Sequence, residues 1–350
     1  MPQILKPSEF LSASGVILDV RSPAEYVQGH IPGAESFPLF DNEERAQIGI
    51  CYKQQGQEPA IELGLAIAGP KLASFVSTAK TLAWDRAASP AANRQVRVHC
   101  WRGGMRSSSM ATLLETAGLK VSVLEGGYKA FRRWVRSTLA LPKSILMLGG
   151  MTGTGKTAIL AALAAQGEQV LDLEHLANHR GSSYGNLTLP AQPSTEHFEN
   201  QIALQWAAFN SQKPVWIEAE SQRIGTCRIP DEVFHLMANA PVFEVQRSHS
   251  ERIALLKQMY GIVNIEELVI ATERIRKRLG GLRTQQVIEL IHKGEAEQAI
   301  DLVLDYYDKT YRYDLQRREV PIQTVDVTGL SAWESATLLS EKADFYRNQY

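Results

Sequence analysis

The segment GMTGTGKT at residues 150–157 constrains the fold of this chain more than any other feature. It matches the pattern G-x-x-x-x-G-K-[ST] in full, and it lies between an apolar run, 144–150, and an alanine-rich run, 156–167. A glycine-rich loop between a strand and a helix is a P-loop, whose backbone amides cradle phosphate groups. We therefore expect a parallel sheet that ends at a phosphate or diphosphate site, formed by Gly150, Gly153, Gly155, Lys156 and Thr157.

Two side chains of this loop have distinct expected roles. Lys156 would neutralise the terminal phosphate groups, and the Thr157 hydroxyl could reach a phosphate-bound magnesium ion. The alternative is a flexible glycine turn without a ligand. The pattern does not say whether the diphosphate belongs to ATP, GTP or another molecule.

The second half of the chain alternates apolar runs with helical patterns. Further strands are predicted at 168–174, 214–220, 241–247 and 322–328, whereas residues 250–320 are predominantly helical in pattern. Strands that alternate with helices favour a parallel sheet covered on both faces. We expect a P-loop NTPase-like α/β domain with a helical C-terminal part over residues 141–350.

The first half alternates in the same way, which predicts a separate α/β domain over residues 1–140. A chain of 350 residues is long enough for two such domains. The segment AASPAANRQ at 87–95 predicts an exposed loop. The strands are predicted at 15–20, 95–100 and 120–126, and the helices at 69–84, 107–118 and 127–140.

The composition sets limits on partners and compartment. The formal net charge is −1, so a polyanionic partner such as RNA would have to meet local basic patches. The three cysteines are widely separated and show no metal-ligand spacing, which fits a reducing cytoplasm. No run approaches about 18 consecutive apolar residues and no charged leader precedes an apolar core, so we expect a cytoplasmic protein without a membrane partner.

Cys100 is the candidate nucleophile. It follows the predicted strand 95–100 and begins the loop HCWRGGMR, after which a helix is predicted. Backbone amides of such a loop and the positive end of a helix dipole both stabilise the thiolate. Gly103 and Gly104 would let the loop curl into an anion nest, and Arg102 or Arg106 could hold a bound oxyanion. The alternative is a buried structural cysteine at the end of a strand.

This loop resembles the active-site loop of the rhodanese family. The segment LDVRSPAEYVQGHIPGAESFP at 18–38 resembles that family's N-terminal signature, and the resemblance covers about residues 1–138. It implies that Asp19 and Arg21 lie near the active site. Sulfurtransferases of the family usually have a six-residue loop, whereas five residues separate Cys100 from Arg106 here, a spacing shared with cysteine-dependent phosphatases. The pocket should therefore be wider and could accept a phosphate-like anion.

Acidic and polar residues follow two strands of the predicted P-loop domain. PVWIEAES offers Glu218 where an aspartate would be usual, with a catalytic or metal role weighed evenly against a solvated strand-end charge. The run HRGSSYG is rich in hydrogen-bond donors that suit a phosphate or polar substrate. A plain surface loop is the alternative for this run, which contributes His179, Arg180, Ser182 and Ser183 as candidates for contacts with substrate or tRNA.

A basic cluster at 273–285 surrounds a Gly280-Gly281 pair. It could close over a polyphosphate or lie along an RNA backbone. A solvated helix face is the equal alternative. The candidate residues are Arg274, Arg276, Arg278 and Arg283.

The two halves together resemble the tRNA 2-selenouridine synthase family, a rhodanese-like domain fused to a P-loop domain. The resemblance runs nearly end to end, and its most telling pieces are HCWRGGMRS, GGMTGTGKT, HRGSSYG, IEAESQRIG and RLGGLRT. It implies a transferase that acts on 2-thiouridine at the wobble position of tRNA. The sulfur would first be geranylated with geranyl diphosphate, and selenium from selenophosphate would then replace the S-geranyl group.

Further expectations follow from this resemblance. Selenophosphate and geranyl diphosphate would be co-substrates, with no tightly bound cofactor and no protein-held metal; magnesium could accompany the diphosphate. An enzyme that produces selenophosphate is a candidate partner. The resemblance leaves open whether Cys100 carries selenium as a perselenide or positions the reactants, with Arg102 and Arg106 holding the anion in either case. A P-loop kinase with a regulatory rhodanese domain and a cysteine-dependent phosphatase are the alternative functions.

Overall fold

A computed structural model describes residues 2–85 and 94–349. The chain forms two compact units, one from Met1–Thr138 with Glu199–Leu204 and the other from Leu139–Phe198 with Gln205–Tyr350. The exposed loop expected at 87–95 lies largely outside the described residues.

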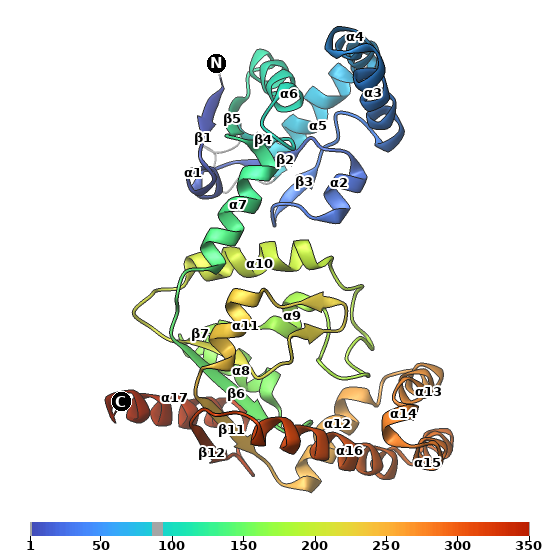
Figure 1. Cartoon of the computed structure of the whole chain (residues 1–350), viewed down its shortest axis with the longest axis vertical. Helices are drawn as coiled ribbons and strands as arrows, with labels where there is room; N and C mark the ends of the chain where they lie inside the picture. Colours follow the sequence, from blue (N-terminus) through green and yellow to red (C-terminus); the bar gives the residue numbers. More distant parts are fainter. Residues whose placement is uncertain (1, 86–93, 350) are drawn as a thin grey trace. The chain divides into compact units, whose positions relative to one another are not determined.

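The first unit contains a five-stranded parallel sheet in the order β1-β5-β4-β2-β3 (Figure 1). The predicted strands at 15–20, 95–100 and 120–126 are confirmed, whereas β1 and β3 were not expected because each has only three residues. Apolar side chains of the central strands are buried, including Leu18 and Val98. The strands are β1 (Gln3–Leu5), β2 (Val16–Asp19), β3 (Ala34–Ser36), β4 (Gln95–His99) and β5 (Lys120–Leu124).

Seven α-helices and a short 3-10 helix accompany this sheet in the described part of the unit. Buried residues of α5 and α6, such as Ala79 and Leu114, join the strands in one core. The helices are α1 (Pro7–Ser12), α2 (Pro23–Gln28), α3 (Asn42–Gln55), α4 (Gln57–Ala68), η1 (Gly69–Lys71), α5 (Leu72–Asp85), α6 (Met105–Thr116) and α7 (Gly127–Leu139).

One stretch, Gln57–Asp85, is long and apolar enough to cross a membrane by these two criteria alone. The predicted helix at 69–84 covers only part of it. The stretch is interrupted at Gly69–Lys71, where the chain forms a 3-10 turn that contains Pro70. Beyond the turn, Ala79 and Ala83 of α5 are buried in the core of the first unit. These are the contacts of a helix that covers a sheet.

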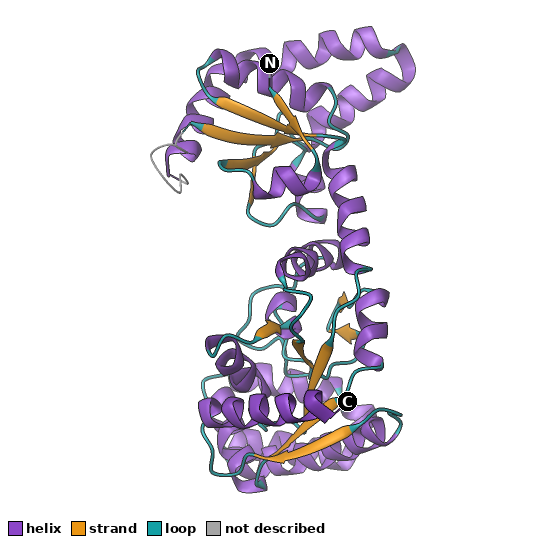
Figure 2. Ribbon diagram, turned by 90° about the vertical axis from the view of Figure 1, so that its left-hand side faces the viewer, coloured by secondary structure: helices purple, strands orange, loops and turns teal. Residues whose placement is uncertain are grey.

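The second unit contains another five-stranded parallel sheet, in the order β12-β11-β6-β8-β7. The strand that leads into the P-loop is central, and β8 lies directly beside it with Leu148 opposite Glu218. In each unit the strands lie among helices (Figure 2). The strands are β6 (Ile145–Gly150), β7 (Gln169–Leu171), β8 (Val215–Glu218), β11 (Val242–Gln246) and β12 (Ile322–Asp326), and a separate hairpin consists of β9 (Arg223–Ile224) and β10 (Cys227–Arg228).

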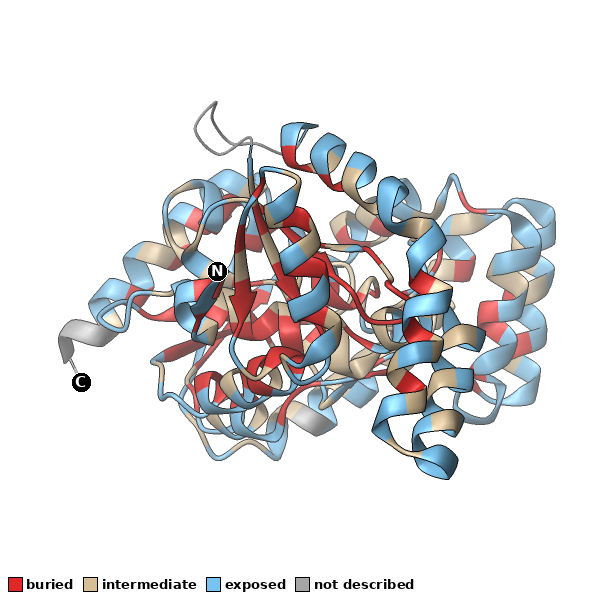
Figure 3. Cartoon of the chain, turned by 90° about the horizontal axis from the view of Figure 1, so that it is seen from above, coloured by how far each residue is buried: buried red, intermediate tan, exposed pale blue. Residues whose placement is uncertain are grey.

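Helices α8 and α17 pack together against this sheet. Leu160 and Leu163 of α8 and Leu339 of α17 share a core with Trp216 and Phe243 of the strands. Figure 3 shows the chain coloured by burial, with buried strands and with helices whose outer faces are exposed. The helices of this layer and its surroundings are α8 (Lys156–Ala165), α9 (Leu173–Ala177), α10 (Thr195–Ala208), α11 (Asp231–Ala238) and α17 (Ala332–Gln349).

The strand predicted at 168–174 ends early, at Leu171, and this part of the prediction was wrong. The Asp172 side chain accepts a hydrogen bond of 2.8 Å from the backbone amide of His175 and so caps α9. Aspartate is a preferred residue at that position. Because of this cap, the strand ends three residues before its expected end at 174, and the chain continues as a helix.

The predominantly helical pattern predicted for 250–320 is confirmed. A small core holds these helices together, with Val263, Ala271, Val287 and Ala299 buried. The helices are α12 (His249–Tyr260), α13 (Ile265–Arg274), α14 (Arg276–Leu279), α15 (Gly281–Lys293) and α16 (Ala296–Gln316).

Candidate functional site

The P-loop has the backbone conformation that its glycines predict. Gly150, Gly153 and Gly155 have φ values of 148°, 84° and 85°. A Cβ atom at Gly150 would lie 2.7 Å from Val245, and one at Gly153 would lie 3.0 Å from the carbonyl oxygen of Arg252. Only glycine fits these positions without a shift of the neighbouring chain.

Arg252 of α12 braces the loop from the side. Its Nε donates a hydrogen bond of 2.8 Å to the Thr152 carbonyl oxygen, and its guanidinium group forms an ion pair of 2.6 Å with Asp308 of α16. Arg252 is buried, so the pair is shielded from water. The helical part of the unit is thereby fixed to the phosphate-binding loop.

Lys156 lies at the first position of α8 and points back across the loop. Its Nζ donates a hydrogen bond of 2.8 Å to the Gly150 carbonyl oxygen and lies 3.5 Å from Glu218 Oε1. The contact with Glu218 follows from the sheet order, because β6 and β8 are neighbours whose carboxyl ends meet at one edge. The expected P-loop lysine and the expected strand-end glutamate are therefore in one site.

Three glutamates meet beside Lys156. Carboxylate oxygens of Glu174, Glu218 and Glu220 all lie within 4.8 Å of one another. Burial, and next the negative charges of Glu218 and Glu220, raise the pKa of Glu174 to about 9. Burial and the charge of Glu218 raise the pKa of Glu220 to about 8, and burial also raises the pKa of Glu218.

This cluster fits a divalent cation. Carboxylate oxygens are the protein ligands that magnesium prefers, and a bound cation would favour their ionised forms. Glu218 Oε2 is buried and has no hydrogen-bond partner among the described residues, so it offers a free ligand position. The Thr157 hydroxyl donates a hydrogen bond of 3.2 Å to Glu174, which places the P-loop threonine at the same point.

Sequence reasoning expected no protein-held metal, and it missed Glu174. That residue lies in α9, on a segment that was assigned to a strand. Its sequence signal, an acidic residue after an apolar run, is shared with Asp172, which proves to be a helix cap. Only the fold distinguishes the two.

The polar run 179–185 partly reaches the P-loop. Arg180, Gly181 and Ser182 line a cavity of about 520 Å³ at the P-loop, together with Lys156 and the three glutamates. A Cβ at Gly181 would lie 2.7 Å from Glu220, so the backbone passes close to the carboxylates. The other two candidates lie apart from that lining: His179 is buried, and the backbone amide of Ser183 donates to the Tyr307 hydroxyl at 3.3 Å.

The basic cluster does not line this cavity. Arg274 donates a hydrogen bond to Asn186, Arg276 of α14 pairs with Glu273 of α13, and Arg283 lies 3.6 Å from Asp305. Arg278 is exposed. These arginines therefore lie on the surface of the helical part. The structure does not show them closing over a polyphosphate at the P-loop.

In the first unit, Cys100 follows β4 and lies at the base of the loop that precedes α6. Its Sγ lies 3.2 Å from the Ser107 hydroxyl oxygen, and only 3% of the residue is exposed. Burial raises the pKa of the thiol, but hydrogen bonds from the Ser107 hydroxyl and from the Ser107 and Arg102 amides, with the charge of Arg106, outweigh it and lower the pKa below its ordinary value. The loop therefore stabilises the thiolate relative to that of an unperturbed cysteine.

The two arginines of the loop differ in their surroundings. Arg106 forms an ion pair of 2.9 Å with Glu25, a residue 81 positions earlier in the chain. Arg102 is exposed. An anion that binds Arg106 must therefore compete with Glu25, whereas Arg102 can move toward an anion at the mouth of the loop.

Asp19 and Arg21 form a buried layer beneath the strand ends. The Arg21 guanidinium lies 2.6 Å from Asp19 and 3.8 Å from the centre of the Tyr128 ring. The Tyr128 amide donates a hydrogen bond of 2.8 Å to the Cys100 carbonyl oxygen, which connects this layer to the loop. The contacts of this pair are those of a support for the loop, and its expected place near the active site stays a prediction.

Comparison with known proteins finds two matching families. Residues 143–334 match the family described as tRNA 2-selenouridine synthase AAA domain, and residues 7–133 match the rhodanese-like domain. The expected architecture, a rhodanese-like α/β domain followed by a P-loop α/β domain with a helical C-terminal part, is confirmed.

Curated proteins named tRNA 2-selenouridine synthase are similar over nearly their full length. The protein from Marinobacter nauticus is 34% identical over 87% of this chain and 89% of its own. Those from Hahella chejuensis and Shewanella denitrificans are 35% and 32% identical, over 88% and 95% of this chain and 87% and 98% of their own. A solved N-terminal domain from Clostridium difficile 630, described as part of an ATP/GTP binding protein, is 38% identical over 38% of this chain and 98% of its own, with a TM-score of 0.35.

Proposed function

Because the chain belongs to the tRNA 2-selenouridine synthase family, we propose that it converts 2-thiouridine at the wobble position of tRNA into 2-selenouridine in two steps. It is a transferase that acts on tRNA. In the first step geranyl diphosphate alkylates the sulfur, and in the second step selenium from selenophosphate replaces the S-geranyl group. The observation that supports this best is one chain with two anion sites, a P-loop beside buried carboxylates and a loop that favours a thiolate.

The P-loop is suited to the first step. The bond between the first geranyl carbon and the diphosphate oxygen breaks, a carbon–sulfur bond forms, and the thiouracil ring loses a proton. Negative charge develops on the leaving diphosphate, and the loop amides and Lys156 are positioned to stabilise it. Magnesium, held by Thr157 and the glutamate cluster, would add charge neutralisation when bound.

The Cys100 loop is assigned to the second step. Selenophosphate attacks the C2 carbon of the base, geranylthiol leaves, and water cleaves the phosphorus–selenium bond to give 2-selenouridine and phosphate. No electrons are gained or lost in this sequence. Arg102, which is exposed, would meet the anion at the mouth of the loop.

The same electron count decides the role of Cys100. Selenium in selenophosphate is at the oxidation level of selenide, and a perselenide on Cys100 would require it to lose two electrons. Neither co-substrate supplies an oxidant. We therefore assign Cys100 a positioning role beside selenophosphate and the S-geranyl carbon, with Ser107 holding its sulfur at 3.2 Å.

The substrate sets the expected partner and compartment. Transfer RNA is found in the cytoplasm, so we place the reaction there. Selenophosphate must be supplied by an enzyme that makes it, and such an enzyme is a candidate partner.

Nucleoside mass spectrometry tests this proposal with variants that separate the steps. Lys156→Ala should lose S-geranyl product from 2-thiouridine tRNA, yet still form 2-selenouridine when given tRNA already geranylated. Cys100→Ala should form S-geranyl product and lose selenium incorporation. Lys342→Ala and Cys51→Ala serve as matched controls, because neither residue lies in these sites.

Two other outcomes would replace the proposal. ATP consumption that survives Cys100→Ala, without any modified nucleoside, would favour the kinase alternative. Phosphate-ester cleavage that depends on Cys100, again without a modified nucleoside, would favour the phosphatase alternative.

A further inference from the structure

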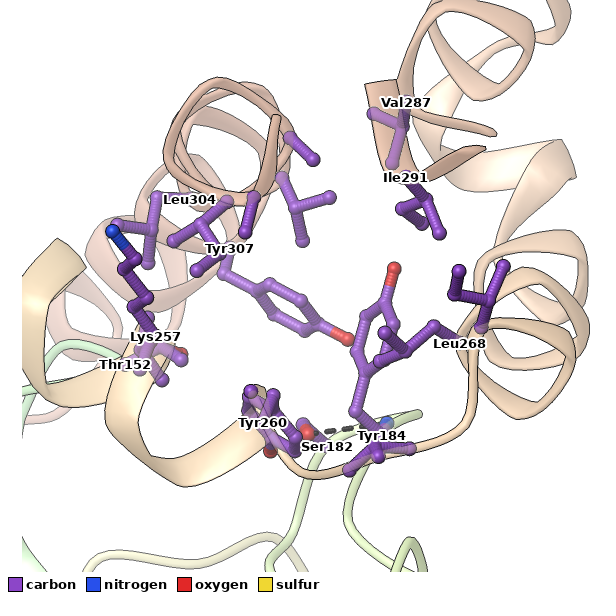
Figure 4. A pocket seen from close by; sticks show the side chains of 18 of the residues that line it. Thr152, Ser182, Tyr184, Lys257, Tyr260, Leu268, Val287, Ile291, Leu304 and Tyr307 are labelled. Carbon is purple, nitrogen blue, oxygen red and sulfur yellow. Dashed lines mark hydrogen bonds between the residues drawn. The ribbon is translucent and has the colours of Figure 1, made fainter. Parts of the chain in front are cut away.

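An apolar cavity of about 270 Å³ lies among the helices of the second unit (Figure 4). Its walls come from α12, α13, α15 and α16, and most of its lining is aliphatic or aromatic. Leu268 of α13, Ile291 of α15 and Leu304 of α16 are representative. Neither Lys156, which we assign to the phosphate charge, nor the three glutamates, which we assign to magnesium, line it.

The cavity adjoins the P-loop site. It shares five lining residues with the cavity of about 520 Å³ at the P-loop. One of them, Thr152, belongs to the P-loop itself. A molecule that places phosphate groups on the loop can therefore extend past the shared residues, which are Thr152, Ser182, Leu256, Tyr260 and Tyr307.

Two tyrosine hydroxyl groups on the cavity wall already have partners. The Tyr184 hydroxyl lies 2.8 Å from the Thr272 hydroxyl, which itself donates to the Leu268 carbonyl oxygen at 2.7 Å. The Tyr307 hydroxyl accepts a hydrogen bond of 3.3 Å from the Ser183 amide. The rings of Tyr184 and Tyr307 extend toward each other in Figure 4. What the two tyrosines offer a ligand is mainly apolar ring surface.

Such a lining selects a hydrocarbon over a nucleoside. The hydroxyl groups of ribose and the polar edge of a base would lose water without gaining equivalent hydrogen bonds in this cavity. An alkyl or alkenyl chain has no such groups and gains from burial. The combination of a diphosphate site with an adjoining apolar cavity is thus matched by a molecule with a diphosphate head and a hydrocarbon tail.

We propose that this cavity binds the hydrocarbon chain of a prenyl diphosphate whose diphosphate group occupies the P-loop. This inference rests on the proposed function and deepens it, because it names the residues that bind the chain and exclude a nucleotide. Helix α15 lines the apolar cavity but not the cavity at the P-loop. Ile291 therefore contacts the part of the chain remote from the diphosphate and limits its length.

Titration calorimetry on the full chain tests the inference with three probes: inorganic diphosphate, geranyl diphosphate and farnesyl diphosphate. Ile291→Trp should weaken geranyl diphosphate binding at least tenfold and leave diphosphate binding within twofold of the wild type. Ile270→Trp is the matched control, since Ile270 is 54% exposed and does not line the cavity. Ile291→Ala should shift the preference toward farnesyl diphosphate at least fivefold, whereas Ile270→Ala should not.

The outcomes distinguish this inference from the function on which it rests. Wild-type binding of geranyl diphosphate in Ile291→Trp, with an unchanged chain-length preference in Ile291→Ala, would overturn the inference and leave geranylation intact. Wild-type protein that binds diphosphate and geranyl diphosphate equally, and geranylates no tRNA, would overturn the proposed function. If Ile291→Trp also loses diphosphate binding because it misfolds, the chain-length preference of Ile291→Ala decides.

Discussion

Glu218 Oε1 lies 3.5 Å from Lys156 Nζ, so the strand beside the P-loop presents its terminal carboxylate to the lysine of the loop. Lys156 is held near the base of the loop, where it also donates to the Gly150 carbonyl oxygen at 2.8 Å. A diphosphate that enters the site can replace Glu218 as the partner of Lys156, because the contact with Glu218 keeps the lysine side chain within the cavity.

Loss of the Lys156 ammonium group should impair the geranylation step most. Lys156→Ala should lower kcat/KM for S-geranylation by about 10²–10³, the range typical of a removed transition-state charge contact. Lys342→Ala, at an exposed position of α17, should stay within twofold of the wild type. Steady-state geranylation of 2-thiouridine tRNA measures both, and equal rates for the two variants would contradict the role of Lys156.

The glutamate cluster should set the affinity for magnesium. Glu174→Gln removes one ionisable ligand and should weaken magnesium binding by at least about tenfold. Substitutions around a metal site typically lower metal affinity by about 10- to 100-fold. Glu168→Gln, at a half-buried position outside the cluster, is the control. Calorimetric titration with magnesium in the presence of diphosphate gives the constants, and an unchanged constant for Glu174→Gln would remove that residue from the site.

The lowered thiol pKa of Cys100 should appear as pH-dependent alkylation. Because the thiolate is the form that reacts, the midpoint of the iodoacetamide rate profile should lie below the ordinary thiol value of 9.0. Ser107→Ala removes a hydrogen bond to the sulfur and should move the midpoint up by roughly half to one pH unit. The measurement uses a Cys51→Ser background, since Cys51 is half-buried and Cys227 is buried.

Exposed Ser109 provides the matched control for that profile. Ser109→Ala should leave the midpoint in place. A midpoint at or above 9 in the parent protein, or equal shifts for the two serine variants, would refute the assigned thiolate stabilisation.

The buried pair of Asp19 and Arg21 should matter for stability. Arg21→Met leaves the buried Asp19 carboxylate with His99, 3.6 Å away, and without its guanidinium partner; breaking a buried ion pair typically costs about 3–5 kcal/mol. Urea unfolding of the full chain should show an earlier transition of the rhodanese-like domain, while the P-loop domain still binds diphosphate. In the double variant Asp19→Asn/Arg21→Met the loss should be smaller than the sum of the two single losses; additive losses would mean that the pair does not interact energetically.

The features that the sequence predicted best are those whose conformation depends on residues adjacent in the chain. The P-loop and the Cys100 loop are continuous segments between a strand and a helix, and their conformations follow from their glycines and flanking elements. The contacts that the sequence could not predict join residues that are far apart in the chain. Arg106 meets Glu25 only because α2 and α6 are brought together by the fold.

The same reason explains the missed glutamate and the apolar cavity. Glu174 joins Glu218 and Glu220 through the order of the sheet, and nothing in its local sequence separates it from the helix-capping Asp172. The cavity is built from four helices, each of which contributes only a few apolar residues to it.

The most direct test of the account is the stoichiometry of the first step. The protein is incubated with 2-thiouridine tRNA, geranyl diphosphate and magnesium, without ATP, and released diphosphate and S-geranyl nucleoside are both quantified. The account predicts one diphosphate for each S-geranyl nucleoside, with both products lost in Lys156→Ala. Absence of S-geranyl nucleoside, or its formation only when ATP is present and hydrolysed, would contradict the assignment of the P-loop to a prenyl diphosphate.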